Sequence, residues 1–357
     1  MKSNLIRFLT FAAIMSSWAY LSIYARSLGI SDPEIGLIVA AYSSALFLAS
    51  FIFGRASDRY GRKPFLIAGL LLSGLVFFLQ IFARDLSSLL LTRVLVGFCV
   101  GIFPASLIAY VHENQEDLSR FSSFGSMGWT FGLLMSGLIA FYLSVESVFI
   151  FSSLLFIPAL LASFRMNFGK HQSLSVPFLP VEIMRKNLPL YLSVLIRHSG
   201  AHMIWTFWPL FLQTLGADLF WVAAIQAING ATQFLFMYTL SSRIEYTSSI
   251  AGGLILAAAT FFSFTLAESF WQIIPTQILL GISWALLYVG GLRCLMDRNL
   301  EKATVSGLFD SALSLSSIIG PLIGAVVVTF GGYSTTMYLA SILAFIGFLL
   351  FRFLKRE

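Results

Sequence analysis

Long apolar runs constrain this chain more than any other feature of its sequence. There are twelve of them, and each is close to the roughly 20 residues that cross a bilayer as a helix. They cover residues 5–25, 35–53, 65–83, 88–111, 122–143, 146–164, 188–214, 219–240, 250–267, 270–292, 305–330 and 333–354. With 58% hydrophobic and 11% charged residues, a water-soluble chain would lack the polar groups to cover its surface. The sequence therefore predicts an all-α membrane protein with twelve transmembrane helices.

The apolar runs are continuous and show none of the alternation that barrel strands require. A lipid-facing strand of an outer-membrane barrel turns every second residue toward a polar lumen. Because these runs keep apolar residues at consecutive positions, the sequence predicts a helical bundle.

The distribution of Lys and Arg predicts the orientation in the membrane. With the N-terminus in the cytoplasm, seventeen of the 22 basic residues lie inside and only Arg26 and Arg84 lie outside. The other three, Arg93, Arg197 and Arg293, fall within spans or at their ends. We therefore expect a multi-pass protein of the plasma or inner membrane with both termini cytoplasmic. The net charge of +6 reflects this bias toward the cytoplasmic side, where it favours contact with anionic membrane lipid. We therefore expect no nucleic-acid partner.

The second half of the chain repeats the first at an offset of 184 residues. The offset pairs Arg59 with Arg243 and Gly69 with Gly253. An even number of spans per half gives both halves the same orientation, so we expect two parallel six-helix repeats. The predicted division is an N-terminal half at 1–164, a cytoplasmic linker at 165–187 and a C-terminal half at 188–357.

A charged loop, GRASDRYGRKP at 54–64, joins the second and third runs. It resembles the motif that joins these spans in the major facilitator superfamily, although Ala56 stands where that family usually has Leu. The matching positions are Gly54, Asp58, Arg59, Gly61, Arg62 and Lys63. The resemblance extends to span number and repeat, and it implies a monomeric secondary transporter whose two halves rock about a central solute site.

The composition of this loop predicts a gate. Gly54 at a helix end allows a close approach by another helix, and Asp58 suits the positive N-terminal end of a facing helix. The resemblance implies that this partner is the eleventh span, so that the loop holds the cytoplasmic side closed. The alternative is a basic loop that serves topology alone, but topology needs no glycines and no aspartate.

Few ionisable residues lie inside the spans, and such residues usually face a cavity. Arg93, in RVLVG of span four, resembles the superfamily's Arg-x-x-x-Gly motif, which implies a part in proton coupling; the alternatives are a salt bridge or a snorkelling arginine. Asp310 is the one carboxylate well inside a span, and we expect it to pair with Arg197, or else with Arg93. His198 and His202 share one face of span seven, where they would relay protons, bind solute or bond to the backbone.

A polar stripe on span eight, Gln226, Asn229 and Gln233, suits hydrogen bonding to a solute, with contact between helices as the alternative. Gln277 is the neutral repeat counterpart of Arg93 and joins the candidate solute residues. Trp129 and Trp205 would stack on a ring of the solute or serve packing alone.

The resulting functional prediction is a proton-coupled transporter of a small organic solute, with export of an amphiphilic compound favoured over two alternatives. These are proton symport of a sugar- or nucleoside-like solute, and a membrane sensor or scaffold that does not transport. No nucleotide-binding loop, nucleophile motif or metal-ligand cluster occurs in the sequence, so we expect neither an enzyme nor a bound cofactor or metal. Cys99 and Cys294 lie in separate runs and predict no disulfide framework.

Overall fold

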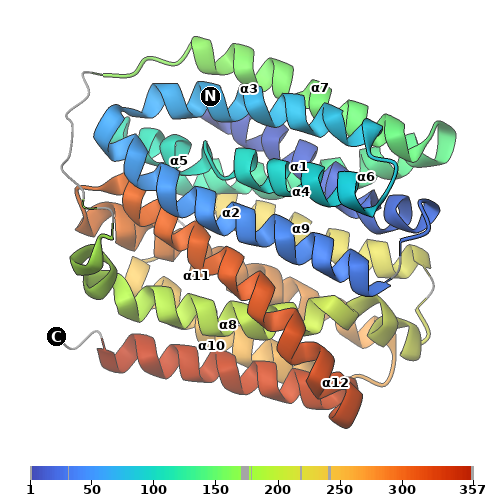
Figure 1. The fold of residues 1–357 in the computed structure, drawn as a ribbon. Coiled ribbons are helices and arrows are strands. Elements are labelled where there is room, and N and C mark those ends of the chain that lie inside the picture. Colours follow the sequence, from blue (N-terminus) through green and yellow to red (C-terminus); the bar gives the residue numbers. More distant parts are fainter. Residues whose placement is uncertain are drawn as a thin grey trace. The chain divides into compact units, whose positions relative to one another are not determined.

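The structure is a computed structural model that describes residues 2–30, 32–169, 177, 179–217, 219–239 and 243–354. Within these ranges every regular element is a helix (Figure 1), which confirms the all-α prediction. The helices are α1 (Lys2–Ser27), α2 (Asp32–Tyr60), α3 (Arg62–Leu79), η1 (Gln80–Phe82), α4 (Leu86–Val100), α5 (Pro104–Glu113), α6 (Leu118–Tyr142), α7 (Val145–Phe164), α8 (Val181–Thr214), α9 (Leu219–Thr239), α10 (Tyr246–Phe264), η3 (Phe270–Gln272), α11 (Ile273–Arg298) and α12 (Lys302–Leu354). Residues 170–176 and 178 of the predicted linker and three of the predicted inside charges, Lys170, Lys355 and Arg356, lie outside the described residues.

Proline and glycine mark two places where neighbouring helices are separated. The run 88–111 is divided into α4 and α5, because Pro104 has no backbone N–H to continue the first helix and instead begins the second. The runs 305–330 and 333–354 form two helical parts of α12, which are separated by a kink at Gly332, where φ is 73° and the backbone is not helical. The prolines and glycines of these runs thus set where the helices break.

Membrane-spanning length is common among these helices. Over the described residues, eight segments are long and apolar enough to cross a bilayer. Two of the eight, Lys302–Gly324 and Val326–Phe353, are parts of α12. This result supports the helical membrane fold, while the count of twelve spans stays a prediction.

Polar caps explain where several helices begin. The side chain of Asp85 accepts a hydrogen bond from the backbone N–H of Ser88 at 2.8 Å. In return, the Ser88 hydroxyl accepts a hydrogen bond from the backbone N–H of Asp85. The backbone bond from Ser88, aided by its hydroxyl, lowers the pKa of Asp85 below its ordinary value. The side chains of Asp117, Ser144 and Glu245 likewise accept hydrogen bonds from backbone N–H groups in the first turns of α6, α7 and α10.

The chain forms two compact units. The first comprises Met1–Pro180 together with Asn299–Ser311, and the second comprises Val181–Arg298 together with Ala312–Glu357. In the first unit, α1 packs against α6 and α7, α2 against α4, and α3 against α7. In the second unit, α11 packs against α9 and α10, around a core that includes Trp208, Phe261 and Phe264. The first turns of α12 therefore belong to the first unit and the rest of that helix to the second.

Equivalent glycines make equivalent contacts in the two units. A Cβ on Gly69 of α3 would lie 2.7 Å from Cβ of Phe103, and a Cβ on Gly253 of α10 would lie 2.8 Å from the backbone nitrogen of Leu287. Both glycines and both partners are related by the same offset of 184 residues. The internal repeat in the sequence thus corresponds to a repeated close contact between helices.

Candidate functional site

Asp58, near the end of α2, binds the beginning of α12. One carboxylate oxygen accepts a hydrogen bond from the backbone N–H of Ala303 at 3.2 Å, and the other accepts from the N–H and the hydroxyl of Thr304, each at 2.6 Å. Asp58 is fully buried. Because the first N–H groups of a helix have no partner within the helix, a carboxylate there both satisfies them and stabilises the positive end of the helix dipole.

Arg62, the first residue of α3, extends this contact into a charged cluster. Its guanidinium donates to Asp58 at 2.9 Å and through Nε to Glu113 at 2.9 Å, with a second bond from Nη2 to Glu113. We call Asp58, Arg62, Glu113, Ala303 and Thr304 the Asp58 cluster. Its charged members join the ends of α2, α3 and α5 to the first turn of α12. Glu113 was missing from the sequence prediction, although its place two residues after the run 88–111, on the same predicted side of the membrane as the loop, was a usable signal.

Gly54 lies one turn before Asp58 and touches the same segment of α12. A Cβ on Gly54 would lie 2.7 Å from the carbonyl oxygen of Ala303 and 3.0 Å from Cα of Gly307. A Cβ on Gly307 would lie 2.4 Å from the carbonyl oxygen of Ser50. The two helices thus meet at backbone contact, and this approach leaves no room for a larger residue on either side.

The remaining loop residues have different environments. Gly61 precedes α3 with φ at 99°, a conformation that other residues rarely adopt. Arg59 and Lys63 are exposed, and the Arg59 guanidinium lies 5.3 Å from the ring centre of Tyr60. Of the six predicted gate residues, Gly54, Asp58 and Arg62 make the contacts within the loop and with α12 described above.

Arg93, in α4, is buried among neutral groups of the first unit. Its Nη1 donates to Gln80 at 3.0 Å and to Ser17 at 3.3 Å, and its guanidinium lies 4.6 Å from the ring centre of Tyr42. Nε of Arg93 has no hydrogen-bond partner among the described residues. The alternative of a salt bridge is therefore not realised in the described part of the chain, and two neutral oxygens and an aromatic face stabilise the charge.

Asp310 lies on α12 within the first unit and is half-buried. The charged group that acts on it electrostatically is Arg7 of α1. Arg7 is buried, and its guanidinium lies 4.0 Å from the ring centre of Phe11. In the sequence, Arg7 is distinguished only as one of the seventeen basic residues predicted to lie inside. The predicted pairing of Asp310 with Arg197 would join the two units and stays a prediction.

Arg197, in α8 of the second unit, is surrounded by rings. Its guanidinium lies 5.3 Å from the ring centres of both Phe261 and Trp284, and its Nη1 is 3.2 Å from Nδ1 of His198. His198 stacks on Trp284 with ring centres 4.7 Å apart and meets His202 edge to face at 4.8 Å. The three predicted coupling residues of span seven are therefore neighbours.

The polar stripe of α9 is engaged in a network of amides. Asn229 donates to the side-chain oxygen of Gln277 at 2.9 Å, and Gln233 donates to the side-chain oxygen of Asn229 at 2.6 Å. All three side chains are buried, whereas Gln226 is only partly buried. This is the contact between helices that the sequence left open as the alternative, and a solute would have to replace these bonds.

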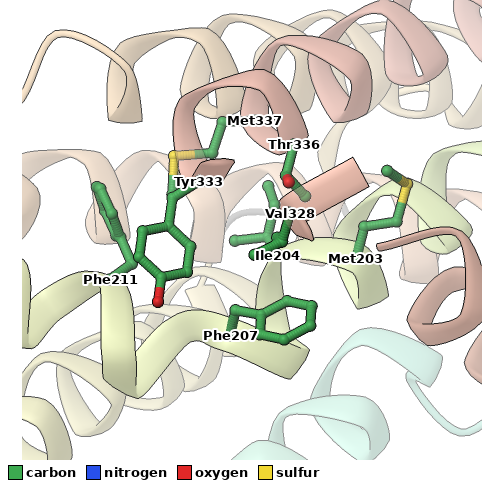
Figure 2. A pocket seen from close by; sticks show the side chains of 8 residues that line it. All are labelled: Met203, Ile204, Phe207, Phe211, Val328, Tyr333, Thr336 and Met337. Atoms are coloured by element: carbon green, nitrogen blue, oxygen red, sulfur yellow. The ribbon is translucent and has the colours of Figure 1, made fainter. Parts of the chain in front are cut away.

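The two predicted tryptophans differ in their surroundings. Nε1 of Trp129, in α6, is buried and has no hydrogen-bond partner among the described residues. Trp205, in α8, packs against Trp208 with ring centres 5.2 Å apart. A small pocket nearby in the second unit has mostly apolar walls (Figure 2) and includes none of the predicted solute residues. Its lining residues are Met203, Ile204, Phe207, Phe211, Val328, Tyr333, Thr336 and Met337.

These features define the class of protein. Spans of membrane length with charged groups buried inside them are typical of multi-pass membrane transporters. A family model described as Major Facilitator Superfamily matches residues 4–309 and, in a second match, residues 190–357. The chain belongs to the major facilitator superfamily, as its charged loop predicts, and is a multi-pass membrane transporter of a small solute.

Two curated relatives and one solved structure extend the comparison. The chain is 26% identical over 348 residues to the multidrug resistance protein MdtG of Salmonella typhimurium, a match that covers 90% of this chain and 86% of the relative. It is 28% identical over 322 residues to the class B tetracycline resistance protein of Escherichia coli, covering 82% and 79%. The crystal structure of the human organic anion transporter MFSD10 is similar in fold, with a TM-score of 0.77, 18% identity and coverage of 98% and 97%.

Proposed function

We propose that this protein exports a small amphiphilic organic compound by alternating access, in exchange for protons. The observation that carries this proposal is the similarity, over most of both chains, to two proteins named for drug resistance. Resistance at a cell membrane is most directly achieved by export. The abundance of aromatic residues, including 36 Phe and 7 Trp, suits an amphiphilic solute.

The Asp58 cluster supplies a gate in this proposal. Four hydrogen bonds reach the carboxylate of Asp58, three from the first residues of α12 and one from Arg62. From the cluster, α12 continues past Ser311 into the second unit. Breaking these bonds would release the start of α12 from α2 and allow the cytoplasmic side to open.

Asp310 is our candidate for the proton-carrying group. It is a carboxylate within an apolar segment, Lys302–Gly324, where a charged form is costly unless a cation lies near. Arg7 supplies that cation in the described structure. A conformational change that moves Arg7 or another cation relative to Asp310 would change the affinity of Asp310 for a proton and so link the proton to transport.

Everted membrane vesicles test this proposal. Wild-type vesicles with an acidified interior should accumulate tetracycline, and dissipating the pH difference should abolish accumulation. Asp310→Asn removes the ionisable group with little change of shape and should abolish gradient-driven accumulation while sparing solute exchange. Glu268→Gln is the matched control, because it removes a carboxylate from an exposed loop.

Two outcomes would contradict this proposal. Accumulation that requires an alkaline interior would favour proton symport, which is the alternative function. Undiminished gradient-driven accumulation in Asp310→Asn would exclude Asp310 as the proton carrier and direct attention to Arg93 or to the histidines of α8.

A further inference from the structure

Arg197 is a buried cation that forms no ion pair with the described residues of the second unit. Its side chain is only 3% exposed, and no carboxylate of the described residues forms an ion pair with it. An arginine side chain does not lose its proton in proteins, so its charge has to be stabilised by its surroundings. Two aromatic faces contribute to this, but Nε has no hydrogen-bond partner in the described part of the chain.

The hydrogen bond that Arg197 forms with a described residue shows what kind of group the site lacks. A guanidinium has no acceptor, so Nδ1 of His198 must accept the bond from Nη1, and the imidazole is neutral at that nitrogen. A neutral imidazole satisfies one N–H but leaves the positive charge unbalanced. A carboxylate in its place would accept from Nη1 and Nε together, in the paired geometry that matches a guanidinium.

The surroundings of Arg197 also describe the rest of a ligand. Phe261 and Trp284 flank the guanidinium, and His198 stacks on Trp284. His198 and Trp284 are partly exposed, so the aromatic groups that cover Arg197 lie at the surface of the second unit. A planar ring that carries a carboxylate could stack at this surface while its anionic group replaces His198 at the guanidinium.

We infer that Arg197 binds a carboxylate of the transported solute, and that the solute is an aromatic or otherwise planar organic acid. This inference rests on the proposed export of an amphiphilic compound and specifies its chemical class. It assigns Arg197 to anion recognition, Trp284 to stacking, and His198 to holding the guanidinium until the anion replaces it.

Binding to the purified full-length chain in detergent tests the inference without any proton gradient. Isothermal titration calorimetry would compare naphthalene-2-carboxylate with naphthalene-2-carboxamide, which has a similar shape but no charge. The wild-type protein should bind the carboxylate about tenfold to a hundredfold more tightly, the range expected for charge-assisted hydrogen bonds. Arg197→Gln should bind both compounds equally weakly, whereas Arg197→Lys should keep a reduced preference because an ammonium cannot form the paired bonds.

Arg185→Gln is the matched control. It removes the same charge from the same helix at an exposed position and should leave the preference for the carboxylate unchanged. Thermal unfolding without ligand separates recognition from folding. Arg197→Gln should unfold at the same temperature as the wild type or at a higher one, because it removes a buried charge that lacks a counter-ion.

Three results would overturn the inference. They are equal binding of carboxylate and amide by the wild type, a preserved preference in Arg197→Gln, and failure of the wild type to bind naphthalene, quinoline and indole carboxylates alike. If Arg197→Gln does not fold, the inference is still tested by the relative affinities of the wild type and of Arg197→Lys for the carboxylate and the carboxamide. Carboxylate binding that depends on Arg197, without proton-driven flux, would refute the proposed export but support the anion site. Proton-driven flux without such binding would support the export and refute the anion site.

Discussion

Replacing Asp58 by Asn should open the cytoplasmic side of the protein. Asn keeps the shape of the side chain but replaces one acceptor oxygen by an NH2 group. That group would face donors, because Asp58 receives bonds from two backbone N–H groups, the Thr304 hydroxyl and Arg62. Arg62 keeps its bonds to Glu113, so the loss falls on the first turn of α12.

The magnitude follows from the number and type of bonds. Hydrogen bonds to a charged group contribute about 1.5–3 kcal/mol each, and a buried donor left without a partner costs about 1–3 kcal/mol. Because the Thr304 hydroxyl can rotate to accept from the new NH2 group, we expect a net loss of about 2–4 kcal/mol. This corresponds to a shift of the closed-to-open equilibrium by a factor of roughly thirty to a thousand.

Spin-label distances would measure this shift. Labels at Tyr60 and Leu300 are suitable because both side chains are exposed, at 62% and 76%, and they lie beside the contact between α2 and α12. The native thiols, Cys99 and Cys294, are buried and would be replaced by Ala first. Asp58→Asn should add a population at longer distance between the two labels.

Glu113→Gln serves as the control for the gate. It removes a charge from the same cluster but leaves every bond between Asp58 and α12 in place, so it should shift the distances far less. An unchanged distance distribution in Asp58→Asn would refute the gate, and so would an equal shift in both variants.

Two further substitutions test single contacts. Gly54→Ala places a methyl group 2.7 Å from the backbone of α12 and should separate the same pair of labels, whereas Gly36→Ala, which meets nothing within 4 Å, should not; equal behaviour of the two would contradict a tight contact at Gly54. Gln80→Leu removes the closest acceptor of Arg93 and should lower the free energy of unfolding by about 1–3 kcal/mol, measured as a lower melting temperature in detergent. An unchanged melting temperature would mean that other groups, or water, stabilise Arg93 equally well.

The sequence determined the class of fold because its causes are local along the chain. Run length and hydropathy predict helices in lipid regardless of how the helices pack, and the offset of 184 residues reveals the repeat without any contact being known. The helix break at Pro104 was also readable, since proline cannot continue a helix, and it lies within a single candidate span, Leu86–Glu113.

The partners of the buried polar groups were decided only by the tertiary structure. Glu113 meets Arg62 across 51 residues of sequence, and Asn229 meets Gln277 across 48. Nothing in the spacing of these residues distinguishes a pair that forms from one that does not, because helix packing sets which faces meet. The same reason applies to Arg197: its place in a span was visible in the sequence, whereas its aromatic surroundings depend on how α8, α10 and α11 pack.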